Sequence, residues 1–360
     1  MELHHAIKRR GAHGYFASAN SSRGFYSLFG EVFSEEKHKS LYILKGGPGT
    51  GKSTLLDGLA ARAEREGYEF EALLCSSDPT SLDGIVIESL GVAVLDGTAP
   101  HSQDPYYPGV CGEIINLGSN WNAEKLHRSR GDIEVLFRDK SEAYSRAYRL
   151  LEAAGIAERD VIHAYERAAD TEKMDAAVKR LLRQLIGRGS GMSPVVRRFT
   201  TAHSVIGKVY VNTLDTVAET TVTVSRSHGF GYLYMRSLYD LSVSLGCRMT
   251  AIPDALLPEY YEAIYYPDEA VLVKLADEDE YERGDVRINC SRFILSDVVR
   301  GDRAKLRFSE KMCANLTDEA ILSLEGAGKI HSKIEEIYKA SMNFDGVSDT
   351  ARKLETRIFG

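Results

Sequence analysis

The sequence contains no long apolar run and no cysteine pattern typical of a cross-linked or metal-bound domain. No segment approaches the roughly 20 consecutive apolar residues that a transmembrane helix needs, so we expect no membrane partner. The five cysteines are widely scattered and include no Cys-x-x-Cys pair, which argues against a disulfide framework and against a zinc site. We therefore expect reduced thiols and a cytoplasmic location.

An excess of basic residues is also missing. Lys plus Arg number 45 and Asp plus Glu number 52, which gives a formal net charge of −7. Proteins whose main task is to coat nucleic acid carry the opposite balance, so a nucleic-acid partner is not favoured, although a local basic patch is compatible with this charge. The composition is that of a globular protein, and 360 residues are enough for two or three domains of about 150 residues each.

A segment rich in glycine and serine divides the chain nearly in half. Residues 187–194 have the composition of a flexible connection, and we interpret them as a linker. The flanking segments, 1–186 and 195–360, share a weak similarity that runs in the same order along the chain. Four residues recur 183 positions later and further matches follow at offsets that fall from 180 to 173, beginning with Phe16, Ala19, Ser21 and Gly24, which match Phe199, Ala202, Ser204 and Gly207. This shared order indicates a diverged tandem duplication.

Apolar periodicity predicts the same succession of elements in each half. In the first half we expect strands at 15–19, 41–44, 70–75, 85–87 and 92–95, helices at 24–33 and 52–66, and a helical region from about 122 to 186. Strands that alternate with helices indicate a largely parallel sheet. The predicted fold class is therefore α/β, with two tandem domains that each contain a largely parallel sheet followed by a helical region.

One motif points directly to chemistry. The residues from 46 to 53 fit the pattern G-x-x-x-x-G-K-[ST] in full, after an apolar strand and before an amphipathic helix. Glycines let successive N–H groups point inward at a phosphate, and the helix N-terminus adds its positive dipole end. The predicted phosphate-binding residues are Gly46, Gly47, Pro48, Gly49, Thr50, Gly51, Lys52, Ser53 and Thr54. Lys52 is expected on the β- and γ-phosphates of ATP and Ser53 on Mg²⁺.

A carboxylate on a neighbouring strand is the expected second metal ligand. The apolar run 92–95 ends in Asp96, which we predict to hold Mg²⁺ opposite Ser53, directly or through water.

The second half keeps the apolar strands and loses the ligands. In our alignment Lys52 corresponds to Tyr232 and Asp96 to Lys274, while Ser53 corresponds to Leu233. A cation at the metal position would repel Mg²⁺, so residues 195–360 are predicted to form a degenerate P-loop-like domain beside the intact domain at 1–186. A displaced alignment is the alternative, although the second loop would still lack a lysine.

Two further residues are weaker candidates for a catalytic role. Arg23 follows the first strand and is expected either to contact phosphate or an acidic substrate, or to be a surface arginine at a helix start. Asp78 follows a central strand and could orient water or an acceptor hydroxyl, but Asp254 has a similar place in the second half, which favours a turn cap.

The remaining signals allow opposed interpretations. His101 could sense the γ-phosphate, but a lone histidine in a loop is more often solvated. The helical region beyond residue 122 is locally basic and could supply an arginine to a transferring phosphate or contact a nucleic-acid backbone. Its cations are Lys125, Arg128, Arg130, Arg138, Lys140, Arg146 and Arg149. Acidic residues are interspersed with them, which favours a solvated face.

Several stretches together resemble the P-loop NTPase superfamily and, within it, a family of duplicated bacterial ATP-binding proteins. They are 16–20, 23–29, 45–54, 75–78 and 95–101. The resemblance implies ATP binding and ATPase activity, names no substrate, and implies a second intact loop in relatives, from which this chain departs at 227–234. The expected function is that of a Mg²⁺-dependent ATPase with one active site and an unknown acceptor or protein partner. The alternatives are a small-molecule or nucleotide kinase and an ATP-dependent switch or scaffold.

Overall fold

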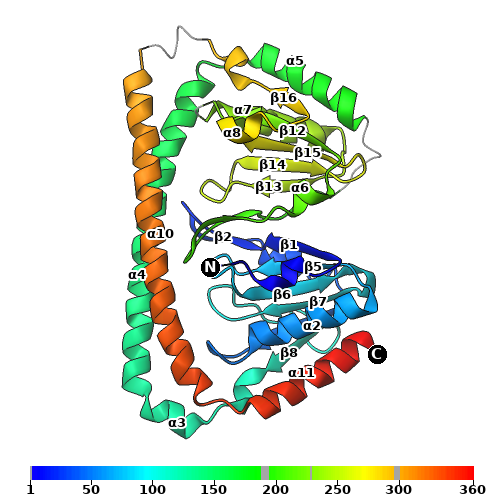
Figure 1. The fold of residues 1–360 in the computed structure, drawn as a ribbon, viewed down its shortest axis with the longest axis vertical. Coiled ribbons are helices and arrows are strands. Elements are labelled where there is room, and N and C mark those ends of the chain that lie inside the picture. The colour runs from blue at the N-terminus through cyan, green and yellow to red at the C-terminus, as the bar shows by residue number, and fades with distance from the viewer. Residues whose placement is uncertain (1, 188–193, 228, 296–300) are drawn as a thin grey trace.

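The computed structural model describes residues 2–187, 194–227, 229–295 and 301–360 (Figure 1). Of the expected linker at 187–194, residues 188–193 lie outside the described residues. The first half contains a six-stranded sheet of order β1-β5-β6-β7-β4-β8, in which only β6 is antiparallel to its neighbours. Its strands are β1 (Ala12–Phe16), β4 (Ser40–Lys45), β5 (Phe70–Leu74), β6 (Leu82–Ile87), β7 (Val92–Asp96) and β8 (Gly112–Asn116).

The second half contains a sheet of the same topology. Its order is β16-β12-β15-β14-β13-β9, again with one strand, β14, antiparallel to both neighbours. Its strands are β9 (Val196–Arg197), β12 (Thr220–Ser225), β13 (Thr250–Pro253), β14 (Tyr261–Tyr266), β15 (Val271–Ala276) and β16 (Val286–Ile288). The α/β class with two mostly parallel sheets is confirmed, and the two sheets have the correspondence that a duplication predicts.

Two β-hairpins join the two sheets at the centre of the molecule. They are formed by β2 (Ser18–Ser21) with β3 (Gly24–Ser27) and by β10 (Thr201–Ser204) with β11 (Gly207–Tyr210). Phe16 and Phe199 exchange backbone hydrogen bonds of 2.8 and 3.0 Å between the halves. The predicted helix at 24–33 is wrong over its first residues, because Gly24 adopts a φ of 77° and turns the chain back into β3. Only α1 (Phe29–Val32) is helical there.

A pair of long helices runs beside both sheets (Figure 1). Helices α4 (Arg130–Glu166) and α10 (Arg303–Lys339) have 37 residues each, or about 55 Å at 1.5 Å per residue, and pack against each other along their length. No helix among the described residues has both the length and the apolar character needed to cross a membrane.

The helices that follow α4 and α10 are exchanged between the halves: each packs on the α/β unit of the other half. Helix α5 (Thr171–Leu181) of the first half packs on α7 (Phe230–Ser244) of the second, whereas α11 (Phe344–Phe359) of the second half packs on α2 (Lys52–Glu66) of the first (Figure 1). Accordingly, Val347, Leu354 and Ile358 of α11 belong to the apolar core of the first sheet. Each α/β unit is thus completed in space by the other half of the chain.

The remaining elements are short and connect the parts above. They are η1 (His5–Lys8), η2 (Glu88–Leu90), η3 (Leu117–Asn120), α3 (Ala123–Arg128), η4 (Leu182–Ile186), α6 (Thr213–Val217), α8 (Glu278–Tyr281) and η5 (Cys290–Phe293).

Candidate functional site

The predicted phosphate-binding loop connects β4 to α2. Its position is the carboxyl edge of the sheet, where β4 lies between the parallel strands β7 and β8. Gly49 and Gly51 have φ angles of 70° and 93°, which favour glycine because a Cβ atom is strained there. The helix predicted at 52–66 has these bounds in the structure, with Gly51 as its N-cap.

The backbone amides of this loop have no protein acceptor. Among the described residues, nothing accepts a hydrogen bond from the N–H of Gly47 or from any N–H of residues 49–54. The N–H groups of these seven residues therefore gather at a helix N-terminus. This arrangement suits the oxygen atoms of a bound anion.

Lys52 lies across the mouth of the loop. Its Nζ atom donates to the carbonyls of Gly46 at 2.8 Å and Gly47 at 2.9 Å, and lies 3.6 Å from Oδ2 of Asp96. Only 10% of the Lys52 side chain and 15% of the Asp96 side chain are exposed. The structure thus brings together two residues that the sequence assigned to phosphate and metal.

Asp96 and Ser53 keep oxygen atoms at this edge of the sheet. Oδ1 of Asp96 accepts from the N–H of Thr98 at 2.9 Å and from its hydroxyl at 2.6 Å, whereas Oδ2 accepts no hydrogen bond from the described residues. The Ser53 hydroxyl accepts from the N–H of Leu82 at 3.0 Å. A carboxylate and a hydroxyl are the hard oxygen donors that Mg²⁺ prefers, so the residues present fit this ion.

Asp78 is held in a turn. Its Oδ1 atom accepts from the N–H of Thr80 at 3.1 Å and from the Thr80 hydroxyl at 2.6 Å, as the turn-cap interpretation predicts. The negative charge of Asp78 acts to raise the pKa of His331, although burial and nearby cations lower that pKa in total. One of these cations is Lys52, so Asp78 lies in the surroundings of the loop.

Arg23 is not brought to the loop. Its Nε atom pairs with Oε2 of Glu259 in the second half at 3.2 Å, and the adjacent Ser22 packs against Gly155 of α4. Lys140, which lies near Lys52, is 15 residues earlier on that helix, a separation of about 22 Å. The structure therefore does not bring Arg23 together with Lys52 and Asp96, because the β2–β3 hairpin reaches toward the other α/β unit.

The C-terminal end of α10 covers the outer face of the loop. A Cβ atom on Gly47 would lie 2.6 Å from the ring of Tyr338, and one on Gly49 would lie 2.9 Å from the carbonyl oxygen of Glu335. These contacts come from the second half of the chain. They could not be expected from the loop motif, because that motif describes only local sequence.

His101 is buried beside a carboxylate. Its side chain is 6% exposed, stacks on Phe29 at 4.3 Å between ring centroids, and lies 3.6 Å from Oδ1 of Asp83. Burial alone would lower the pKa of His101, but the negative charges of Asp83 and Asp96 raise it. The expectation of a solvated histidine is therefore wrong, and Asp83 was not recognised because it lies inside an apolar strand.

The second half has a closed loop at the equivalent position. There the N–H groups at the start of α7 bond to the loop itself: Phe230 to Ser227 at 3.2 Å, Gly231 to Arg226 at 2.9 Å and Tyr232 to Gly229 at 3.2 Å. Residue 228, within the sequence departure at 227–234, lies outside the described residues. The donors that are free in the first half are thus used internally in the second.

The packing of the helix that follows each loop also changes the alignment of the two halves. Buried residues of α2 recur in α7 at an offset of 179, namely Leu55, Leu56, Leu59 and Ala63 as Tyr234, Met235, Leu238 and Ser242. At this offset Lys52 corresponds to Gly231 and Ser53 to Tyr232, whereas the helix N-caps Gly51 and Gly229 are 178 residues apart and match Lys52 to Phe230. No lysine stands at the position of Lys52 at either offset. A side chain at Gly231 would start 2.8 Å from the carbonyl oxygen of Ser225, so a lysine has no room there.

The metal position shifts by one residue in the opposite direction, from an offset of 178 to one of 179. Gly91 and Ala270 each directly precede a strand, and they are 179 residues apart. Both have a positive φ, of 67° at Gly91 and 52° at Ala270. Asp96 therefore corresponds to Leu275, and Lys274 is not at the metal position. Lys274 pairs instead with Asp215 at 2.6 Å, beside a cavity of about 270 Å³ in the second half. The conclusion that this half lacks the metal carboxylate stands, for a different reason.

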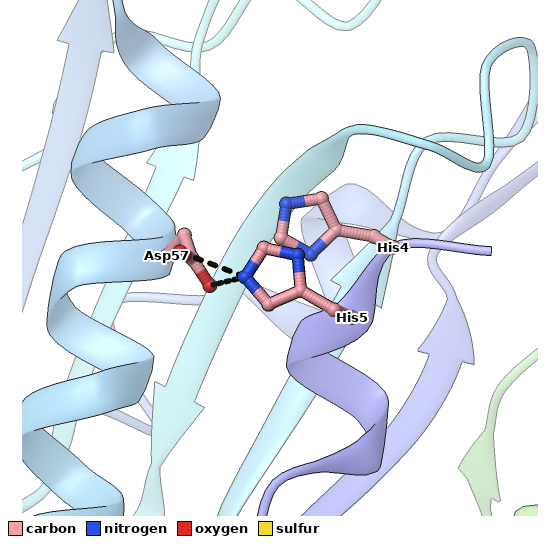
Figure 2. Close-up of side chains that lie close together, drawn as sticks. All are labelled: His4, His5 and Asp57. Carbon is pink, nitrogen blue, oxygen red and sulfur yellow. Dashed lines mark hydrogen bonds and ion pairs between the residues drawn. The ribbon is translucent and has the colours of Figure 1, made fainter. Parts of the chain in front are cut away.

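A separate polar cluster lies near the N-terminus (Figure 2). His5 pairs with Asp57 at 3.0 Å, and His4 stacks on His5. These side chains already have structural partners, since Nδ1 of His4 accepts from the N–H of Ala6 and Asp57 also pairs with Arg9. We assign no metal to them.

Comparison with models of known families, with curated proteins and with solved structures found no match.

Proposed function

We propose that the chain binds one Mg²⁺-complexed nucleoside triphosphate at residues 46–54 and hydrolyses it. The observation that carries this proposal is the contrast between the two loops. Seven amides of the first loop have no protein acceptor, whereas the corresponding helix start in the second half bonds to its own loop. Adenine as the base follows from the family resemblance, and the triphosphate follows from the loop.

The roles of the residues follow from their positions. The loop amides donate to phosphate oxygens, and Lys52 exchanges the carbonyls of Gly46 and Gly47 for the β- and γ-phosphates. Ser53 and Asp96 hold the metal through a hydroxyl and a carboxylate. Bound Mg²⁺ supplies positive charge to the phosphate oxygens. Because Lys52 faces Asp96 at 3.6 Å, each group balances the charge of the other before nucleotide arrives.

Calorimetric titration with Mg²⁺ and a non-hydrolysable ATP analogue tests the proposal. We expect one site per chain, at least a 100-fold loss of affinity in Lys52→Ala, and normal affinity in Lys329→Ala. Lys329 is a matched control because its side chain is 73% exposed and pairs with Glu325 on the surface of α10. Absence of binding by the unmodified chain, or two sites of similar affinity, would contradict the proposal.

Assays of phosphate release under the same conditions then test hydrolysis. We expect release to require Mg²⁺ and to disappear in Lys52→Ala. Nucleotide binding without any phosphate release would leave the binding assignment in place and contradict the reaction.

A further inference from the structure

Lys140 of α4 is a half-buried cation that has no carboxylate partner in the described part of the chain. Its Nζ atom contacts Nδ1 of His331 at 3.4 Å and lies 5.2 Å from the centre of the Phe137 ring. Burial lowers the pKa of Lys140, and the positive charge of Lys52 lowers it further. Lys140 therefore lies near the loop lysine, and no carboxylate of the described residues forms an ion pair with it.

His331 holds this lysine in place. It lies on α10 and so comes from the second half of the chain. Burial lowers the pKa of His331, and the charges of Lys140 and Lys52 act in the same direction, whereas Glu335 and Asp78 oppose them. A neutral imidazole can accept a hydrogen bond from the Lys140 ammonium, as the 3.4 Å contact requires.

Two ammonium groups that face one region repel each other unless an anion lies between them. Lys52 has Asp96 beside it, but the contacts of Lys140 among the described residues are with the His331 imidazole and an aromatic ring. Lys52 belongs to the loop, whose free amides are donors suited to an anion. A phosphate that extends beyond the reach of the loop would meet Lys140.

The second half provides an internal comparison. Gly155 and Gly328, 173 residues apart, make equivalent contacts with Ser22 and Val205, which fixes the correspondence of α4 with α10. At this offset Lys140 corresponds to Cys313 and His331 to Glu158, and these two also contact each other. The lysine and the histidine therefore occur together beside the open loop, and both are absent beside the closed loop of the second half.

We propose that Lys140 contacts the terminal phosphate of the bound nucleotide and that His331 is the residue that positions it. The active site is then assembled from both halves of the chain, since the loop and Lys140 belong to the first and His331 to the second. This inference rests on the proposed function. It assigns to Lys140 the stabilisation of charge on the transferring phosphoryl group, which the loop alone leaves partly exposed.

Comparison of triphosphate with diphosphate tests the inference. Affinities of Mg·ADP and of Mg²⁺ with a non-hydrolysable ATP analogue are measured for the unmodified chain, Lys140→Met, Lys140→Arg, His331→Ala and Arg138→Met. Arg138 lies on the same helix with 66% of its side chain exposed and is the matched control.

We expect Lys140→Met to keep the affinity for ADP, to lose about 10-fold of the preference for the triphosphate and to lose about 100-fold in turnover. Lys140→Arg should recover part of the turnover because it restores the charge. His331→Ala should lower turnover with a smaller change in triphosphate preference, and Arg138→Met should behave as the unmodified chain.

The failure of this inference is distinguishable from failure of the proposed function. If the unmodified chain binds and hydrolyses nucleotide while Lys140→Met keeps both the triphosphate preference and the turnover, the inference alone is wrong. If Lys140→Met loses ADP and triphosphate affinity equally, the lysine has a structural role and the inference is also overturned. If the unmodified chain binds no nucleotide, the proposed function is wrong and the inference with it.

Discussion

Replacement of Asp96 by asparagine separates the two roles proposed for this carboxylate. Asparagine keeps an oxygen that can accept from the N–H and hydroxyl of Thr98, so the turn after β7 should persist. What disappears is the negative charge that faces Lys52 at 3.6 Å. The substitution therefore changes the electrostatics of the site and leaves its shape almost unchanged.

The size of the effect follows from that distance. Two unit charges 3.6 Å apart attract each other by about 4–5 kcal/mol at an effective dielectric constant of 20. The substitution removes the cost of burying the Asp96 charge but leaves Lys52 buried without its partner, so we expect the free energy of unfolding to fall by about 3 kcal/mol.

Nucleotide binding should change in opposite directions with and without metal. Metal-free ATP should bind about 10-fold more tightly to Asp96→Asn, because the phosphates no longer meet the carboxylate and Lys52 is no longer paired; this corresponds to about 1.4 kcal/mol. Mg²⁺ should no longer strengthen binding, and turnover should fall by at least about 100-fold.

Calorimetric titrations with and without Mg²⁺, together with phosphate release, measure these changes. Asp104→Asn is the control, since Asp104 also pairs with a lysine, Lys45 at 2.9 Å, but is 78% exposed. If Mg²⁺ strengthens ATP binding equally in Asp96→Asn and in the unmodified chain, the carboxylate does not serve the metal and the assignment is refuted.

Two further predictions concern the loop contact and the second half. Gly47→Ala should weaken nucleotide binding about 10-fold, because the new methyl group would lie 2.6 Å from the Tyr338 ring. In the double variant, Tyr338→Ala should restore most of this loss, as measured by titration. Equal losses of affinity in the single and the double variant would contradict the contact. Burial, with the negative charge of Asp254, raises the pKa of Glu262 to about 7, so the folded state holds a proton that the unfolded chain releases near pH 4.5, and stability should fall as pH rises from 4.5 to 7. Glu262→Gln should remove this dependence, on the order of 2 kcal/mol, and denaturant unfolding at pH 5 and pH 8 measures it; an unchanged slope would contradict the assignment.

The sequence was most informative where structure is locally determined. The bounds of α2 follow from Gly51 at its start, Gly67 at its end and the spacing of Leu55, Leu56 and Leu59 between them. The loop and Asp96 could be placed at one edge of the sheet because the carboxyl ends of parallel strands meet there. The fold class required only the alternation of strands and helices.

Contacts between residues far apart in the chain could not be predicted from the sequence. Lys140 is one cation among interspersed acidic residues, and only the packing of α4 on α10 brings it to His331. The exchange of α5 and α11 leaves no periodic signal, because an apolar face has the same pattern whichever core it covers. The alignment of β15 with β7 was displaced by one residue because Ala270 adopts a conformation that glycine usually adopts, so the match to Gly91 is not visible in the sequence.

The exchange of terminal helices has a consequence for biosynthesis. Helix α11 follows every other element in the chain, yet Val347, Leu354 and Ile358 complete the core beneath the first sheet. During synthesis, the surface of α2 that α11 covers therefore stays exposed to solvent until α11 has been synthesised. Contacts of such wide sequence separation form slowly, and an apolar surface left open for that time is a place where chaperones bind and nascent chains associate.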